Sequence, residues 1–245
     1  MELIYRREFP VSQEYLDPSG AITPAAILYL SQEAAGGHCK TLGTDWDTLQ
    51  KKGLFWALIR TQVQIHADLQ GLESVTVETW PMPTTRVAYP RCTVGYDPEG
   101  KPLFTSISLW VLMDTRTRAM VLPDKSGIRV DGIIRGTEPE LPKTFPKLQP
   151  ECLVFRTVGL SELDQNGHMN NTKYMVWVMD LLSEAFRENH PVKSFGLCYM
   201  AEVLKDQQIR LGYTLTDGLL TVDAHREKTD DPGKTDRVFC AKVEF

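Results

Sequence analysis

The chain has 245 residues and a formal net charge of -5, from 27 Lys and Arg against 32 Asp and Glu. Because 42% of its residues are apolar and 9% are aromatic, it can bury a normal core, which excludes intrinsic disorder. The acidic balance excludes a basic coat for nucleic acid, and no apolar run approaches the roughly 20 residues of a membrane helix. The first residues resemble neither a signal peptide nor a transit peptide, so we expect a cytoplasmic protein with no nucleic-acid or membrane partner.

Residues 16–24 predict a tight turn that leads into a helix. Gly20 suits the turn, and Thr23 before Pro24 is typical of an N-cap with proline at the first helical position. Antiparallel β-strands with short turns are expected after this helix, with a hairpin signal at residues 97–100. The β-rich runs of this half are 54–66, 74–80, 86–96 and 103–113.

A proline-rich stretch divides the chain into two halves. Four of the 15 prolines fall within residues 139–150, which predicts an extended and fairly stiff linker. We therefore expect an N-terminal domain over residues 1–136, a linker over 137–151 and a C-terminal domain over 152–245.

The second half repeats the first, with residues 163–171 matching residues 16–24 at an offset of 147 (163 minus 16). Gly167 supplies the turn, and Asn170 or Asn171 supplies the helix cap. A hairpin signal at 216–218 lies among the strands expected after the helix. The β-rich runs of this half are 195–204, 208–215, 219–225 and 238–245.

The second predicted helix is apolar at every position from Tyr174 to Met179 and again at 181, 182, 185 and 186. A helix that is apolar nearly all round is buried on nearly all sides, which in a β-rich protein indicates a helix wrapped by a curved sheet. Both halves therefore predict an α+β tandem (double) hotdog fold. Each half would be a curved antiparallel sheet wrapped around a long central helix.

Three polar side chains stand at alternate positions after the second turn: Asp164, Asn166 and His168. The first copy keeps the aspartate but lacks the amide and the imidazole. The turn leads into a helix N-terminus, whose unpaired N–H groups can bind an oxyanion, so this set indicates a hydrolytic site. A turn-stabilising role stays open, because Asp and Asn are ordinary turn and capping residues and His168 could be a satisfied turn histidine.

Glu202 is the second candidate for chemistry. Strand alternation predicts that it shares a face with Met200 and Leu204. A carboxylate among apolar neighbours is either paired or functional, whereas exposure on an edge strand would be an ordinary alternative.

The run from Leu163 to Tyr174, with a later strand that reads Tyr199-x-x-Glu202, resembles the acyl-acyl carrier protein (acyl-ACP) thioesterases. These are the plant plastid enzymes and their bacterial relatives. The resemblance covers the whole chain and implies hydrolysis of fatty acyl-ACP thioesters in fatty acid biosynthesis, with acyl carrier protein as partner. The catalytic residues that it implies are Asp164, Asn166, His168 and Glu202.

In the expected mechanism, Asn166 and the N–H groups at the helix start, near Asn170 and Asn171, hold the carbonyl oxygen of the substrate. Glu202 and His168 position and deprotonate water. Such an apparatus suffices for a thioester, whose carbonyl is already electrophilic.

Two further residues bear on the kind of catalysis. Val203 stands where the plant enzymes often have a cysteine, so a thiol mechanism is not expected. Asp164 either orients His168 or attacks the thioester directly, and the sequence leaves both routes open.

The resemblance also implies an acyl-chain pocket in the N-terminal half, whose own site has decayed. Candidate lining residues could equally be plain core, and a basic segment between Asp114 and Arg135 could dock the acidic carrier protein or be ordinary solvated surface. The pocket candidates are Tyr29, Trp56, Ile59, Trp110 and Leu112, and the docking candidates are Arg116, Arg118, Lys125, Arg129 and Arg135.

Two other functions stay open on the sequence. One is an acyl-CoA thioesterase of the hotdog superfamily, and the other is a non-catalytic module that binds an acyl carrier. No His or Cys pattern has metal-ligand spacing, so neither a metal nor another cofactor is expected. The chain could act as a monomer or a homodimer, and its chain-length preference is not predicted.

Overall fold

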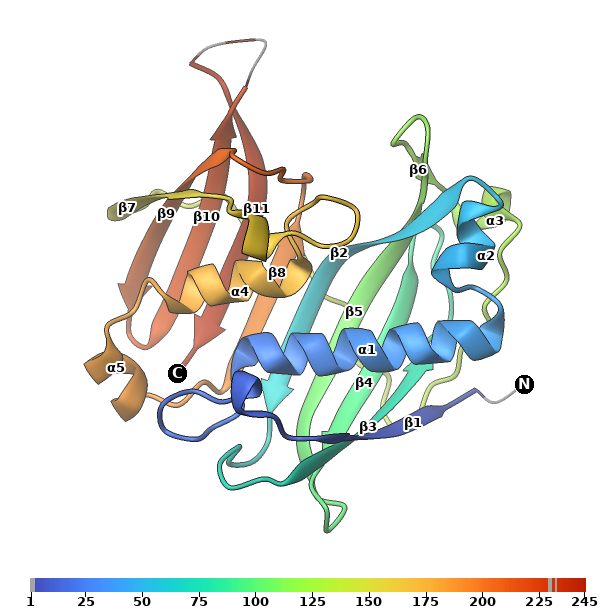
Figure 1. The fold of residues 1–245 in the computed structure, drawn as a ribbon, viewed down its shortest axis with the longest axis horizontal. Coiled ribbons are helices and arrows are strands. Elements are labelled where there is room, and N and C mark those ends of the chain that lie inside the picture. The colour runs from blue at the N-terminus through green and yellow to red at the C-terminus, as the bar shows by residue number, and fades with distance from the viewer. Residues whose placement is uncertain (1–2, 229–230, 232) are drawn as a thin grey trace. The chain divides into compact units, whose positions relative to one another are not determined.

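The computed structural model describes residues 3–228, 231 and 233–245. The chain separates into two compact units, Met1–Pro142 and Lys143–Phe245, and the division falls inside the predicted linker. Each unit contains an antiparallel sheet with a helix across one face (Figure 1). In the described part of the chain, none of the helices has the length and apolar content of a membrane span.

One antiparallel sheet forms the N-terminal unit. Its strands are β1 (Tyr5–Pro10), β2 (Leu54–Ile65), β3 (Ser74–Pro81), β4 (Tyr89–Tyr96), β5 (Pro102–Asp114) and β6 (Met120–Val121). They pair in the order β1-β3-β4-β5-β2, and the short β6 pairs with β5. The third predicted run begins at Tyr89 instead of 86, because Thr85 closes a turn by accepting the Ala88 N–H at 2.9 Å.

Helix α1 (Pro24–Leu42) lies across this sheet and packs against β1 and β3 (Figure 1). The predicted N-cap is confirmed, since Thr23 Oγ1 accepts the Ala26 N–H at 3.1 Å. Gly43 ends the helix in the left-handed conformation. The shorter helices of this unit are η1 (Gln13–Tyr15), α2 (Trp46–Gln50) and α3 (Pro123–Ser126).

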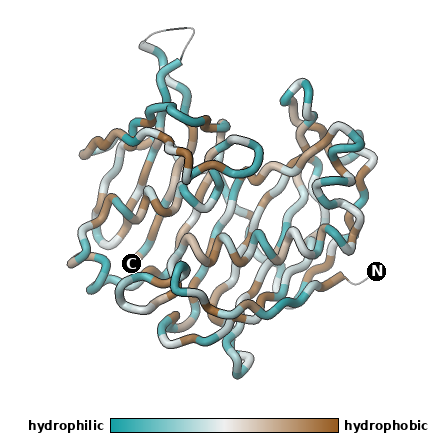
Figure 2. The backbone as a smooth tube through the Cα atoms, viewed as in Figure 1, coloured by the Kyte–Doolittle hydropathy of each residue, from teal (hydrophilic) through white to brown (hydrophobic). Residues whose placement is uncertain are grey.

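The C-terminal unit contains five antiparallel strands. Its strands are β7 (Cys152–Thr157), β8 (Ser194–Tyr199), β9 (Gln208–Thr216), β10 (Leu219–Glu227) and β11 (Thr235–Glu244), in the order β8-β11-β10-β9-β7. Its helices are η2 (Leu160–Glu162), α4 (Asn171–Met179) and α5 (Glu184–Asn189). The face of α4 that carries Tyr174 packs on the sheet, with ring centroids 4.8 Å from Phe239 and 5.3 Å from Tyr199. Figure 2 shows hydrophilic residues at many of the turns and apolar residues along the strands.

Three predictions for this unit were wrong in detail. The second helix is not one long helix: α4 ends at Met179, and Ser183 starts α5 by accepting the Phe186 N–H at 3.3 Å. Its burial is also less complete than expected, because Val176 is exposed. Strand β8 ends at Tyr199 instead of 204, because the N–H groups of residues 200 and 201 both donate to the Val238 carbonyl and the chain turns away.

The predicted architecture is confirmed in both units. Each unit has a leading strand, a helix that lies on the sheet, and further antiparallel strands joined mainly by short turns. The hairpin at 97–100 closes with the Gly100 N–H on the Asp97 carbonyl at 3.0 Å. The hairpin at 216–218 places Asp217 and Gly218 at positive φ. The fold is therefore a tandem hotdog.

A buried ion pair holds the start of the C-terminal unit. Asp223 on β10 is only 3% exposed, and its Oδ1 lies 2.5 Å from Arg237 Nε on β11. Arg237 also donates to the carbonyls of Phe145 and Pro146, at 3.0 and 2.9 Å. The Leu148 N–H donates to Asp223 Oδ2 at 3.1 Å. One buried carboxylate thus fixes both a strand pair and the end of the proline-rich segment.

Replacing Asp223 by alanine should lower the free energy of unfolding by about 3–5 kcal/mol, because it leaves Arg237 partly buried without its counter-charge. Urea denaturation followed by tryptophan fluorescence measures this loss. Lys205→Ala is the control, since the exposed Lys205–Asp206 pair should contribute no more than about 1 kcal/mol. Equal losses in the two variants would contradict the prediction.

The five cysteines differ widely in exposure, and none of them forms a disulfide. Cys92, Cys198 and Cys240 are buried, whereas Cys152 is exposed. Burial raises the pKa of Cys92 to about 12, so this thiol stays protonated at neutral pH. A hydrogen bond with Cys198, together with burial, raises the pKa of Cys240 as well.

Iodoacetamide near pH 8 should therefore alkylate Cys152 first and leave the three buried thiols intact in the native protein. Peptide mass spectrometry after partial labelling measures the order. Urea-unfolded protein is the control, in which all five thiols should react. Early labelling of Cys92 in the folded protein would show that the prediction is wrong.

Candidate active site

The predicted motif of the C-terminal unit forms a tight loop that leads into α4. Asp164 Oδ1 accepts the backbone N–H groups of Asn166 at 2.8 Å and His168 at 3.1 Å. The Gly167 N–H donates to the Asp164 carbonyl at 3.1 Å, and Gly167 has a φ of 76°, which favours glycine. The Asp164 carboxylate therefore holds the loop together through its own backbone.

The equivalent loop of the N-terminal unit has the same hydrogen bonds. Asp17 Oδ1 accepts the N–H groups of Ser19 at 2.9 Å and Ala21 at 3.1 Å, and the Gly20 N–H donates to the Asp17 carbonyl at 2.9 Å. The aspartate is thus a structural feature of both loops. What distinguishes the C-terminal loop is the pair of side chains at 166 and 168, where the first copy has serine and alanine.

The His168 imidazole and the Glu202 carboxylate meet beside this loop. Nε2 of His168 lies 3.5 Å from Oε2 of Glu202, and the two side chains are 24% and 46% exposed. A bridge between His168 and Leu204, with the Met169 N–H donating to the Val203 carbonyl at 2.8 Å, holds the two segments together. Glu202 lies outside the strands, in the segment between β8 and β9, so its predicted place on a strand was wrong.

Arg226 fixes the segment that carries Glu202. Its Nη1 donates to the Glu202 carbonyl at 2.9 Å and to Gln207 Oε1 at 2.9 Å. Gln207 Oε1 also accepts the Leu204 N–H at 3.0 Å. Neither side chain was found by sequence reasoning, because Arg226 comes from β10 and neither it nor Gln207 belongs to the repeated motif.

Asn170 and Asn171 form the start of α4. Asn170 Oδ1 accepts the Thr172 N–H at 2.9 Å and its hydroxyl at 2.8 Å, so Asn170 is the cap. The Asn171 carbonyl accepts the Tyr199 hydroxyl at 3.0 Å. Within the described residues, the backbone N–H of Asn171 has no hydrogen-bond acceptor. One N–H at this helix end is therefore available to a ligand.

Two part-buried hydrogen bonds of Glu162 support the segment before the loop. The Glu162 carboxylate accepts the Gly159 N–H at 2.7 Å and a short hydrogen bond from the Trp177 indole. Burial raises the pKa of Tyr174 well above its ordinary value, and the nearby carboxylates of Glu202 and Asp164 add to this rise. The Tyr174 phenol therefore stays protonated next to both acids. Sequence reasoning missed Glu162, which carries no motif signal of its own.

The four predicted catalytic residues thus lie in one region of the C-terminal unit. Asn166 is exposed, and its Nδ2 lies 3.4 Å from Asp164 Oδ2. The described residues contain no group of three or more His, Cys, Asp or Glu arranged to hold a metal ion. The arrangement offers a carboxylate–imidazole pair, an amide and a helix N–H, which together suit acyl-group hydrolysis.

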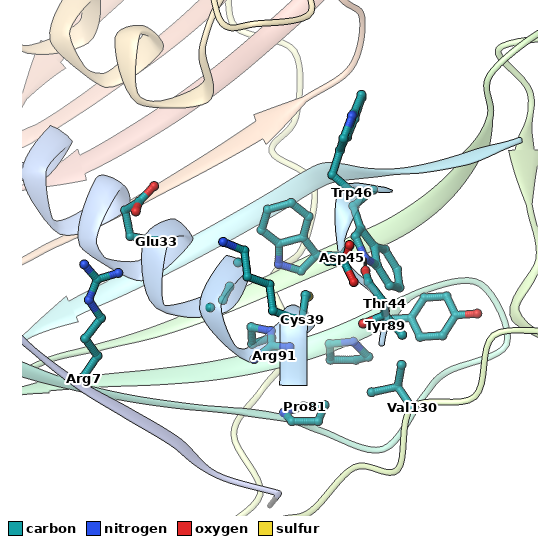
Figure 3. A pocket seen from close by; sticks show the side chains of 17 residues that line it. Arg7, Glu33, Cys39, Thr44, Asp45, Trp46, Pro81, Tyr89, Arg91 and Val130 are labelled. Atoms are coloured by element: carbon teal, nitrogen blue, oxygen red, sulfur yellow. Dashed lines mark hydrogen bonds between the residues drawn. The ribbon is translucent and has the colours of Figure 1, made fainter. Parts of the chain in front are cut away.

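The N-terminal unit contains a cavity of about 370 Å³ next to the end of α1 (Figure 3). Trp56 and Trp110, two of the residues named as candidates for an acyl pocket, line it. Leu112 is fully buried in the core cluster against which both tryptophans pack. Ile59 lies where the register of β2 and β5 shifts, and Tyr29 is exposed beside Tyr15. Neither is among the residues that line this cavity.

The fold and this site define a tandem hotdog protein whose polar candidate site lies in the C-terminal unit. Residues 2–124 match the family model of the acyl-ACP thioesterase N-terminal domain, and residues 154–235 match that of the C-terminal domain. The chain belongs to the acyl-ACP thioesterase family, which confirms the resemblance seen in its motif.

Curated relatives agree with this assignment. The chain is 28% identical over 233 residues to a chloroplast dodecanoyl-[acyl-carrier-protein] hydrolase of Umbellularia californica. The matched region covers 88% of this chain and 60% of the relative. It is 25% identical over 223 residues to a chloroplast palmitoyl-acyl carrier protein thioesterase of Arabidopsis thaliana, covering 85% and 54%. The chain therefore spans 54–60% of the length of these two relatives.

Solved structures confirm the fold. A 12:0-ACP thioesterase from Umbellularia californica superposes with a TM-score of 0.80 at 26% identity, covering 100% of this chain and 97% of the other. An acyl-ACP thioesterase from Bacteroides thetaiotaomicron superposes with a TM-score of 0.81 at 22% identity, covering 99% and 97%.

Proposed function

We propose that the protein hydrolyses fatty acyl-ACP thioesters to free fatty acid and acyl carrier protein, at the His168–Glu202 site. One observation carries the proposal: an imidazole and a carboxylate meet beside a loop whose counterpart in the N-terminal unit has Ala21 instead of histidine. The two loops have the same backbone hydrogen bonds, and the N-terminal loop forms them without a histidine. The turn itself therefore does not require His168. The names of the relatives support acyl-ACP as the substrate.

The substrate carbonyl oxygen would be held by the Asn171 N–H and the Asn166 amide. Negative charge develops on this oxygen when the carbonyl is attacked, so donors aimed at it stabilise the transition state more than the ground state. One such donor is typically worth about 3 kcal/mol. The Asn171 N–H is suited to this role because it has no acceptor within the described residues.

Water would be the nucleophile. When Glu202 accepts the Nε2–H of His168, Nδ1 carries the lone pair that takes a proton as water attacks the carbonyl carbon. The tetrahedral intermediate then collapses, the C–S bond breaks, and the proton passes to the leaving sulfur. The separation of 3.5 Å is long for a hydrogen bond, and such contacts commonly shorten when substrate binds.

Asp164 would position His168 in this mechanism. Its Oδ1 already accepts two backbone N–H groups, and charge-assisted hydrogen bonds of this kind lower the nucleophilicity of a carboxylate. Asp17 makes the same bonds beside Ala21, so holding the loop is sufficient reason for an aspartate here. These contacts support the orienting role over direct attack.

The acyl chain would occupy the N-terminal cavity, with Trp56 and Trp110 in its wall. For carrier docking, all five predicted basic side chains are exposed. Two of them also have partners in the fold: Arg135 pairs with Glu78 at 2.8 Å, and Arg118 lies over the Phe55 ring. The other three predicted basic side chains are therefore the better candidates for docking the acidic carrier protein: Arg116, Lys125 and Arg129.

Release of fatty acid from acyl-ACP thioesters of 8 to 18 carbons, beside the matching coenzyme A thioesters, tests the proposal. Faster turnover on the carrier protein supports it and also gives the chain-length preference. Faster turnover on coenzyme A would assign the protein to acyl-CoA hydrolysis. Tight binding of acyl-ACP without turnover would make it a binding module. A cytoplasmic location and the choice between monomer and homodimer stay predictions, for cell fractionation and light scattering.

A further inference from the structure

Two side chains outside the repeated motif hold the backbone on either side of Val203. Arg226 Nη1 donates to the Glu202 carbonyl at 2.9 Å, and Gln207 Oε1 accepts the Leu204 N–H at 3.0 Å. Arg226 Nη1 also donates to Gln207 Oε1 at 2.9 Å. Because one guanidinium nitrogen contacts both oxygens, Arg226 and Gln207 form a single hydrogen-bonded unit.

The His168 loop holds the same three-residue segment from its other side. The Val203 carbonyl accepts the Met169 N–H at 2.8 Å, and Leu204 forms a bridge with His168. The Glu202 carboxylate belongs to this segment and lies 3.5 Å from the imidazole. The position of the carboxylate relative to the imidazole therefore depends on both sets of contacts.

The N-terminal unit has an equivalent segment with the same backbone contacts. The Ile22 N–H donates to the Leu69 carbonyl at 3.1 Å, as the Met169 N–H does to the carbonyl of Val203. A bridge joins Gln70, the next residue, to the N-terminal loop. Leu69 therefore corresponds to Val203, at an offset of 134 residues (203 minus 69).

The two segments differ in the side chain that accepts their last N–H. In the N-terminal unit the Gln70 N–H donates to Asp68 Oδ1 at 3.1 Å, so this carboxylate closes its own turn. Asp68 has the position of Glu202 (202 minus 134). In the C-terminal unit the equivalent N–H, that of Leu204, donates to Gln207. Because Gln207 accepts this N–H, the Glu202 carboxylate is not needed to close the turn and can pair with the imidazole.

Arg226 also has an ion-pair partner, through its other terminal nitrogen. Its Nη2 lies 3.6 Å from Asp236 Oδ2, and Lys228 Nζ lies 3.1 Å from Asp236 Oδ1. The Asp236 side chain is 40% exposed, and ion pairs at the surface contribute little to stability. The contacts of Nη1 and Nη2 are separate, so substitutions can test the hydrogen bonds and the ion pair independently.

We propose that Arg226 and Gln207 are positioning residues for hydrolysis, because their hydrogen bonds keep the Glu202 carboxylate beside the His168 imidazole. The effect on rate rests on the proposed function, whereas the placement of the carboxylate rests on the contacts of the two side chains. A displacement of about 1 Å in such a site can lower the rate by about 10²-fold. The ion pair with Asp236 does not take part.

Steady-state kinetics of four variants on one acyl-ACP test the effect on rate. Arg226→Met and Gln207→Met keep an unbranched side chain without the hydrogen-bonding groups, so kcat should fall about 10- to 100-fold while KM stays within about threefold. Gln207→Glu keeps an oxygen that accepts from both donors, so it should recover most of the kcat lost in Gln207→Met. Asp236→Asn is the control, with kcat within about twofold of wild type. The two Gln207 variants keep the test decisive if Arg226→Met does not fold.

The tautomer of the His168 ring gives a readout that a loss of stability alone would not move. When Glu202 accepts the Nε2–H, the neutral ring keeps its proton on Nε2, which ¹⁵N NMR shifts near pH 8 report. Wild type, Gln207→Glu and Asp236→Asn should show this tautomer. Arg226→Met and Gln207→Met should populate both tautomers, because the carboxylate no longer faces the ring.

Unchanged kcat and an unchanged tautomer in Gln207→Met and a folded Arg226→Met would overturn the proposal. Equal falls of kcat in Gln207→Met and Gln207→Glu, or an equal fall in Asp236→Asn, would overturn it as well, because the loss would not follow the hydrogen bonds. A wild type that hydrolyses no acyl-ACP would refute the proposed function. The tautomer in Gln207→Met then decides the positioning role: a change supports it, and no change overturns it.

Discussion

Replacing His168 by alanine should lower kcat for acyl-ACP hydrolysis by about 10²–10⁴-fold, the range typical of a lost general base. KM should change little, because the imidazole acts on water and does not hold the acyl chain. The side chain is only partly exposed and pairs with Glu202 across 3.5 Å, so its removal leaves a carboxylate without its proton-transfer partner. Steady-state assays on one acyl-ACP across pH measure both parameters.

His190→Ala is the matched control, because this exposed histidine at the end of α5 stacks on Phe186 and lies in another loop of the same unit. Its kcat should stay within about twofold of wild type. Glu202→Gln should resemble His168→Ala, and the double variant should lose little more than either single variant, since the two groups act as a unit. A His168→Ala enzyme with kcat within about tenfold of wild type would refute the assigned base.

Local chemistry explains which features could be predicted from the sequence. The caps depend on neighbouring residues alone, so the sequence predicted Thr23 as the first cap and narrowed the second to Asn170 or Asn171, of which Asn170 is the cap. The end of β8 depends on which N–H groups reach Val238 on another strand, which no local pattern records. Glu202 was therefore identified as a candidate but assigned to the wrong element.

Positioning groups were missed for the same reason. Arg226 holds the Glu202 segment from β10, and only the pairing of distant strands brings the two together. Among the residues that the resemblance suggested for a pocket in the N-terminal unit, Trp56 and Trp110 line a cavity, whereas Leu112 lies in the core, the alternative that the sequence had left open. Apolar patterns indicate burial, and they do not distinguish a side chain that fills the core from one that faces a cavity.

The two aspartates of the repeat allow a prediction with an internal control. Asp164→Ala should lower kcat by about 10²-fold, because the loop loses the acceptor for the Asn166 and His168 N–H groups and the imidazole moves out of place. Asp17→Ala removes the same bonds from the other loop. Both variants should lose about 0.5–2 kcal/mol of stability, as for a lost cap, and only Asp164→Ala should lose activity. Urea denaturation and acyl-ACP assays measure the two effects.

Asp164→Asn distinguishes the two routes that the sequence left open. The amide keeps an oxygen that accepts both backbone N–H groups, so the loop and His168 stay in place, but it cannot form an anhydride with the acyl group. If Asp164 positions His168, this variant keeps more than about a tenth of kcat, since only the charge of the acceptor is lost. If kcat of Asp164→Asn falls as far as kcat of Asp164→Ala, the Asp164 carboxylate is instead the nucleophile. The loop would then keep its geometry, and only the carboxylate that attacks the thioester would be missing.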